Sequence, residues 1–134
     1  VHCLEAGVAG TLNANGPAGE ADMRRLIETC RDVANSDARL VWAPRSFLDA
    51  QGVAPWSDMP VWVPAGGEFA GAASVSIERA VAAGLGHRTL ADSVAATLAW
   101  YRDERGIEDP LRAGLSPERE RELLALLADD AADS

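Results

Sequence analysis

The amino-acid sequence predicts an α/β fold, with a short parallel sheet and about five helices around it. Three consecutive segments carry this prediction: an apolar segment at 10–14, a segment of helical periodicity at 20–34, and a second apolar segment at 39–43. A strand, a helix and a strand in this order form a βαβ unit, whose strands run parallel. We therefore expect the sheet to be built from residues 10–43.

Residues 1–7 are typical of the last two turns of a helix that stops at Gly7, because glycine readily adopts the left-handed conformation found there. A helix with an end and no beginning leads us to expect that the sequence is part of a longer protein. The strand at 10–14 follows, and the turn-forming residues Asn15-Gly16-Pro17 close it. We expect Asn13 to hold this turn.

The segment 20–34 has an apolar stripe at the spacing of an amphipathic helix. The stripe consists of Met23, Leu26, Ile27, Cys30 and Val33. Glu20 and Asp22 stand at the expected N-terminus of this helix, where negative charge is favourable.

The second strand, at 39–43, would place Leu40 and Trp42 on the same face. Residues 46–50 then have the composition of a helix of one to two turns. From 53 to 73 no regular structure is expected, because prolines and glycines interrupt every apolar pattern.

Two helices are expected next, each with a capping residue at its start. Ser76 caps a short helix that ends at Gly84. Thr89 caps a longer one that ends before Gly106, with Asp92 in the capping-box position. The apolar face of the short helix consists of Ile77, Ala80 and Val81. The apolar face of the longer helix consists of Leu90, Val94, Leu98 and Tyr101.

The last helix begins with Ser116 as its cap and Pro117 in its first position. Its packing face is expected to consist of Leu123, Leu124 and Leu127. Glutamates alternate with arginines over 118–122, which is typical of a solvated, ion-paired helix surface. An acidic tail follows at 129–134.

The composition excludes several classes of protein. The chain has 134 residues, 48% of them apolar and 25% charged, as in a globular protein of one domain. Its formal net charge of −9, with no basic cluster, argues against nucleic acid and anionic membranes as partners. No apolar run approaches the roughly 20 residues of a membrane span. Cys3 and Cys30 suggest reduced core residues of a cytoplasmic protein.

The motifs of several catalytic mechanisms are missing. All 12 cationic side chains are arginine, which removes Schiff-base chemistry and the P-loop lysine. No nucleophile motif and no metal-ligand spacing is present. We expect His2 and His87 to be surface or interface histidines. The sequence therefore predicts no catalytic residue, no metal site and no cofactor site in this chain.

The irregular segment 53–73 gives the best signal for a binding site. It holds Trp56, Trp62 and Phe69 among prolines and interleaved polar residues. A long segment without regular structure inside a domain is commonly functional. Two interpretations are open: the aromatic side chains are additional core, or they line a pocket for an organic ligand.

Four segments of the chain, in order, are similar to one known family: 10–17, 40–44, 56–64 and 76–101. The first reads Gly-Thr-Leu-Asn-Ala-Asn-Gly-Pro, and the last runs from Ser-Ile-Glu-Arg-Ala through Gly-Leu-Gly-His-Arg-Thr-Leu to Thr-Leu-Ala-Trp-Tyr. Together they resemble the C-terminal lobe of extended short-chain dehydrogenases/reductases, the NAD-dependent epimerase/dehydratase family. The resemblance covers residues 1–101, and Leu12 stands where the family has an aromatic residue.

The resemblance implies that residues 1–106 are the substrate-binding lobe of an NAD(P)-dependent oxidoreductase or epimerase. Residues 107–134 would add a C-terminal helix and the acidic tail. In this family the N-terminal Rossmann lobe holds the dinucleotide loop and the catalytic Tyr-x-x-x-Lys, and neither motif occurs here. Tyr101 is followed four residues later by Arg105 and not by lysine, so this pair does not replace the catalytic Tyr-x-x-x-Lys. The absent Rossmann lobe would bind NAD or NADP, and this chain would not be catalytic on its own.

Under the same resemblance the substrate-binding residues are Trp56, Trp62 and Phe69, with Arg79 as a polar candidate. The expected partners are a small-molecule substrate, the missing Rossmann lobe and a second copy in a homodimer.

The alternative is a stand-alone module that binds a small molecule or another protein. The two hypotheses differ in an observable way. A lobe that docks on a Rossmann lobe should expose apolar side chains near Leu4, Leu12 and the helix at 90–101, whereas a self-sufficient module should be polar there.

Overall fold

The computed structural model describes residues 2–16, 22–64, 66, 71, 75–105 and 113–132. The chain divides into two compact units, each built from two stretches of sequence. Unit 1 consists of Val1–Ala38 and Ala70–Ile107, and unit 2 consists of Arg39–Phe69 and Glu108–Ser134. The expected division into 1–106 and 107–134 groups the residues differently, because residues 39–69 fall into the same unit as the C-terminal helix.

The predicted α/β fold is wrong, since the described residues are mostly helical and form no sheet. The segment 10–14 has no regular structure, and 39–43 is not paired with a neighbour. Among the described residues the one β-bridge joins Pro55 and Met59 within a single turn. A strand needs a neighbour for its N–H and C=O groups. Among the described residues neither of the two predicted strands has such a neighbour, so neither forms a strand.

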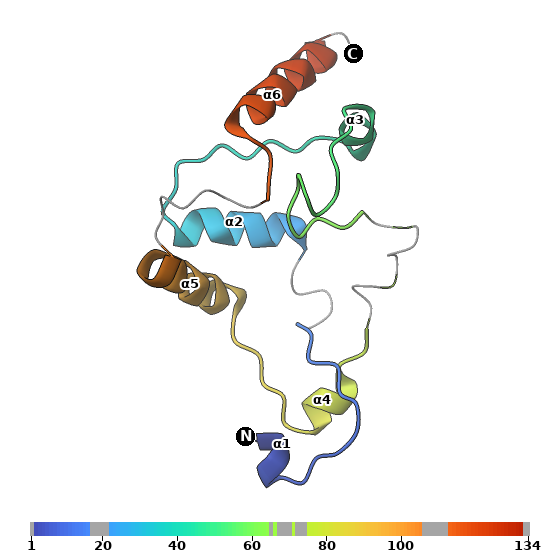
Figure 1. The fold of residues 1–134 in the computed structure, drawn as a ribbon, viewed down its shortest axis with the longest axis vertical. Helices are drawn as coiled ribbons and strands as arrows, with labels where there is room; N and C mark the ends of the chain where they lie inside the picture. The colour runs from blue at the N-terminus through green and yellow to red at the C-terminus, as the bar shows by residue number, and fades with distance from the viewer. Residues whose placement is uncertain are drawn as a thin grey trace. The chain divides into compact units, whose positions relative to one another are not determined.

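Unit 1 contains two short helices and two longer ones among its described residues: α1 (His2–Glu5), α2 (Met23–Val33), α4 (Glu78–Ala82) and α5 (Leu90–Trp100). A π-helical turn, η2 (Tyr101–Arg105), continues α5. The helix α2 packs against α5, and the two lie side by side in Figure 1. Their predicted apolar stripes are half-buried except at Cys30, and neither helix has a fully buried residue.

The starts of α2 and α5 are capped by side chains. The Asp22 carboxylate accepts the N–H of Arg25 at 2.7 Å, which fixes the first turn of α2. The Thr89 hydroxyl accepts the N–H of Asp92 at 3.0 Å and donates to the carboxylate of Asp92 at 2.6 Å. The cap predicted at Thr89 is therefore confirmed, with Asp92 bound to the hydroxyl.

The ends of α1 and α4 are stopped by glycines, as predicted. Gly7 and Gly84 have φ values of +61° and +98°, in the left-handed region. At α4 the N–H of Leu85 reaches back to the carbonyl of Ala80 at 2.9 Å, the bond of a Schellman motif. On the predicted apolar face of α4, Ala80 is buried, whereas Val81 is exposed.

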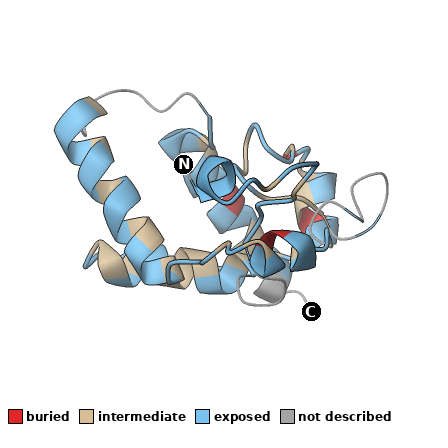
Figure 2. Ribbon diagram, turned by 90° about the horizontal axis from the view of Figure 1, so that it is seen from below, coloured by how far each residue is buried: buried red, intermediate tan, exposed pale blue. Residues whose placement is uncertain are grey.

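Unit 2 contains α3 (Arg45–Ala50), a turn-rich segment after it, and α6 (Pro117–Ala132). Its core is small. Figure 2 shows in red the few residues that are buried in the described parts of both units. The buried residues of this core are Phe47, Val53 and Leu123, with Ala43, Leu48, Met59, Leu115 and Leu127 packed around them. The core therefore joins one face of α6 to α3 and to the segment that follows it.

The α6 helix begins as predicted, because the Ser116 hydroxyl accepts the N–H of Arg119 at 3.1 Å. Two ion pairs on its surface, Arg119–Glu122 at 2.7 Å and Arg121–Glu118 at 3.2 Å, confirm the ion-paired face. The predicted packing face is wrong at Leu124, which is exposed.

The described residues give three further results. Cys3 and Cys30 are free and exposed, so the expectation that they are core residues is wrong. None of the described helices combines the length and the apolar character needed to cross a membrane. No group of three or more His, Cys, Asp and Glu side chains among these residues could hold a metal ion.

Candidate functional site

The four predicted substrate residues are divided between the two units. Trp56 and Trp62 belong to unit 2, and Arg79 belongs to unit 1. Phe69 lies outside the described residues. Neither unit by itself brings the set together.

Trp56 and Trp62 lie on a tight turn that is held by backbone hydrogen bonds. The N–H groups of both tryptophans donate to the carbonyl of Met59, at 3.2 Å and 3.1 Å. The Asp58 carboxylate closes the other side by accepting the N–H of Ala54 at 2.8 Å. Although the sequence predicts no regular structure here, the local hydrogen bonds define the backbone.

Trp56 combines an exposed side chain with an unusual backbone. It is 58% exposed, and its φ is +67°. Val61, five residues on, has the same φ and is 56% exposed. Side chains other than glycine rarely adopt this region, and holding one there costs on the order of 1–3 kcal/mol. Trp56 is therefore not additional core, whereas Trp62 is half-buried.

Arg79 projects from α4 and is exposed. Its guanidinium lies against the backbone of Gly10, where an added Cβ would be 3.4 Å from the terminal nitrogen Nη2. Gly10 has a φ of +100°, so glycine both permits the turn and leaves room for the arginine.

Side-chain hydrogen bonds join the N-terminal stretch of unit 1 to the stretch around α4. The Asn13 amide donates to the carbonyl of Ser76 at 3.1 Å, and not within its own turn. The His87 ring bonds to the carbonyl of Asn15 at 2.8 Å. The His2 ring bonds to the carbonyl of Ala83 at 2.6 Å. Both histidines are exposed, as expected, but each has a backbone partner.

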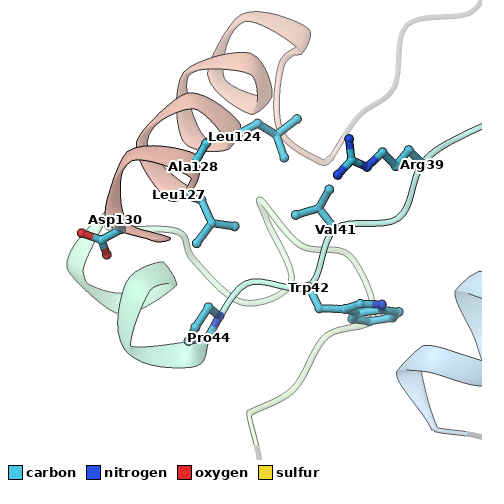
Figure 3. A pocket seen from close by; sticks show the side chains of 8 residues that line it. All are labelled: Arg39, Val41, Trp42, Pro44, Leu124, Leu127, Ala128 and Asp130. Carbon is cyan, nitrogen blue, oxygen red and sulfur yellow. The ribbon is translucent and has the colours of Figure 1, made fainter. Parts of the chain in front are cut away.

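A groove of about 710 Å³ lies in unit 2, between residues 39–44 and α6. Its walls are mostly apolar, with Arg39 toward one end and Asp130 toward the other (Figure 3). The lining residues are Arg39, Val41, Trp42, Pro44, Leu124, Leu127, Ala128 and Asp130. Of the predicted substrate residues that the structure describes, Trp56, Trp62 and Arg79 do not line this groove.

Comparisons with models of protein families, with curated proteins and with solved structures found no match to this chain.

Sequence reasoning did not identify the groove. The sequence predicts a strand for Arg39, Val41 and Trp42, and places Leu124 on the packing face of the last helix. The alternation of Arg39 and Val41 in an extended segment was the available signal, because alternate residues of extended backbone share a side. It could not reveal that α6, some 80 residues later in the sequence, forms the opposite wall.

Proposed function

We propose that this chain is the substrate-binding C-terminal part of an NAD(P)-dependent oxidoreductase or epimerase, similar to the extended short-chain dehydrogenases/reductases. An N-terminal Rossmann lobe binds NAD or NADP and supplies the catalytic tyrosine and lysine. This chain contacts the small-molecule substrate through Trp56, Trp62 and Phe69, with Arg79 as a polar contact. By itself it transfers neither a hydride nor a proton.

The observation that carries this proposal is the contact between the two segments with the strongest resemblance. Residues 10–17 and 76–101 are far apart in the sequence, yet Asn13 bonds to Ser76 and His87 bonds to Asn15. The residues that make these contacts lie within the similar motifs. Two motifs of one family are expected to pack together in this way.

Exposed apolar side chains give a second line of support. Leu4 is 88% exposed and Trp100, at the end of α5, is 53% exposed. If a Rossmann lobe docks on this chain, exposed apolar side chains are expected near Leu4, Leu12 and the helix at 90–101; of these, Leu12 is half-buried. The helix α5 is apolar around most of its circumference, which is typical of a helix that is covered on several sides.

The free, exposed cysteines support a cytoplasmic location for the enzyme. Cys3 and Cys30 form no disulfide in the described structure. Exposed thiols of this kind persist where the compartment is reducing.

The decisive experiment reads the coding sequence upstream of Val1 and assays the complete product. We expect a strand followed by Gly-x-x-Gly-x-x-Gly, and a Tyr-x-x-x-Lys further on. The complete protein should enhance the fluorescence of NADH or NADPH on binding, and the isolated chain should not. If both motifs are absent upstream, the proposal is overturned and a stand-alone binding module is favoured.

The role of Trp56 is tested in the complete enzyme. Trp56→Ala should raise KM for the substrate about tenfold or more with little change in kcat, because it removes a binding contact and no reacting group. Val61→Ala, an exposed apolar residue on the same turn, is the matched control and should leave KM unchanged. Equal effects of the two variants would indicate that the turn matters only for folding.

A further inference from the structure

We propose that the groove of unit 2 binds an amphipathic organic carboxylate, with the acid group on Arg39 and the apolar body between residues 41–44 and α6. This site goes beyond the proposed function, because its lining includes none of the described substrate candidates Trp56, Trp62 and Arg79.

The two walls of the groove come from extended backbone and from a helix. Figure 3 shows Val41, Leu124 and Leu127 facing one another across the space, with Ala128 beside them and the Arg39 guanidinium near its rim. Leu127 and Pro44 form part of the lining closest to α3. The groove is therefore apolar between Arg39 at one end and Asp130 at the other.

The size and lining of the groove fit a small molecule. A volume of about 710 Å³ falls within the range of ligand-binding pockets, which are mostly apolar with a few polar groups that set orientation. Val41, Trp42 and Leu124 are 46%, 41% and 41% exposed. An apolar body that covers them would remove this surface from water, which is favourable.

Arg39 determines the charge of the ligand. Its guanidinium forms no hydrogen bond or ion pair with another described residue, whereas Arg31, Arg45, Arg119 and Arg121 each pair with a carboxylate. A guanidinium offers paired N–H donors whose spacing matches the two oxygens of a carboxylate. The chain as a whole has a net charge of −9, which repels anions. The unpaired guanidinium of Arg39 therefore favours binding of an anionic group only at its own end of the groove.

Aliphatic and aromatic acids share this chemistry, and the experiment separates them. The chain is titrated with decanoate and with naphthoate, and with decanol and naphthyl methanol as uncharged counterparts, while its two-dimensional amide NMR spectrum is recorded. We expect shifts at the backbone amides of residues 39–43 and 124–128 and at the indole N–H of Trp42, but not at the indole N–H groups of Trp56, Trp62 or Trp100. The acids should bind at least fivefold more tightly than the alcohols.

Matched variants test each wall. Arg39→Gln should weaken binding of the acids about five- to tenfold and leave the alcohols unaffected, because it removes the charge-assisted hydrogen bonds. Arg121→Gln, on α6 but outside the groove, should bind as the parent does. Leu124→Ala should weaken acids and alcohols alike without unfolding the chain, because this side chain is already exposed. Preference for decanoate or for naphthoate identifies the ligand as aliphatic or aromatic.

Three results would overturn the proposal. They are shifts that lie outside the groove, equal binding of acids and alcohols, and unchanged acid binding in Arg39→Gln when circular dichroism shows a parent-like fold.

Discussion

At the scale of the residue, glycine is needed at position 84 for two reasons: its left-handed backbone and the His2 ring that lies against it. Its φ of +98° stops α4, and a Cβ placed on it would lie 2.6 Å from Nε2 of the His2 ring. The same ring nitrogen bonds to the carbonyl of Ala83. The absence of a side chain at Gly84 therefore permits both the end of α4 and the docking of α1.

Gly84→Ala should destabilise unit 1 by about 2 kcal/mol, mainly from the left-handed backbone at this position, and the added Cβ should displace the exposed His2 ring from the Ala83 carbonyl. Urea denaturation followed by circular dichroism measures this change. Gly86→Ala is the matched control, because nothing lies within 4 Å of its added Cβ, and it should change stability by less than about 0.5 kcal/mol. Similar losses in the two variants would contradict the role given to Gly84.

At the scale of the element, one buried leucine and one arginine of α6 contact the other segments of unit 2. Leu123 enters the core beside Phe47 and Val53. Arg119 bonds to the carbonyl of Gln51 at 2.8 Å and also pairs with Glu122. The arginine thus links α6 to the C-terminal end of α3, although the sequence assigns it to an ion-paired surface.

Arg119→Ala should lower the free energy of unfolding of unit 2 by about 1–2 kcal/mol, because the partly buried Gln51 carbonyl loses a charged donor. Thermal denaturation monitored by circular dichroism measures the loss. Arg121→Ala, whose ion pair is fully on the surface, should have no measurable effect. If Arg121→Ala lowers the free energy of unfolding as much as Arg119→Ala does, then surface charge stabilises the helix and the Gln51 contact does not.

At the scale of the whole molecule, the described residues bury little apolar surface. Phe47, Val53, Ala80 and Leu123 are the buried hydrophobic residues among them. The longer helices of unit 1, α2 and α5, have no buried residue. A helical chain with so few buried apolar residues is expected to associate with another protein surface, such as that of a second copy of itself.

The purified chain should therefore self-associate as its concentration rises, as analytical ultracentrifugation would detect. Trp100→Gln should weaken this association at least fivefold, because it removes a large exposed apolar side chain at the end of α5. Thr97→Gln changes a residue of the same helix that is already polar and exposed, and should leave association unaltered. A strictly monomeric parent chain would contradict this prediction.

The sequence by itself determined where the helices lie and most of their ends. The cap predicted at Ser76 is wrong, because the N-cap of α4 is Ile77, whose side chain makes no capping hydrogen bond. The apolar stripes of α2 and α5, the caps at Thr89 and Ser116 and the glycine at 84 depend on residues close together in the chain, so local periodicity and capping chemistry were sufficient. The same local signals placed the ion-paired face of α6 correctly.

Only the tertiary structure decided that no sheet forms among the described residues and which side chains meet. The segments 10–14 and 39–43 have the composition of strands, but a strand exists only through hydrogen bonds to a neighbouring strand, and neither segment has one in the described part of the chain. The partners of Asn13 and His87 and the groove beside Leu124 likewise depend on residues more than 60 positions away. Pairing and packing over such distances are set by the whole chain, which is why local patterns predicted the helices and failed at the sheet.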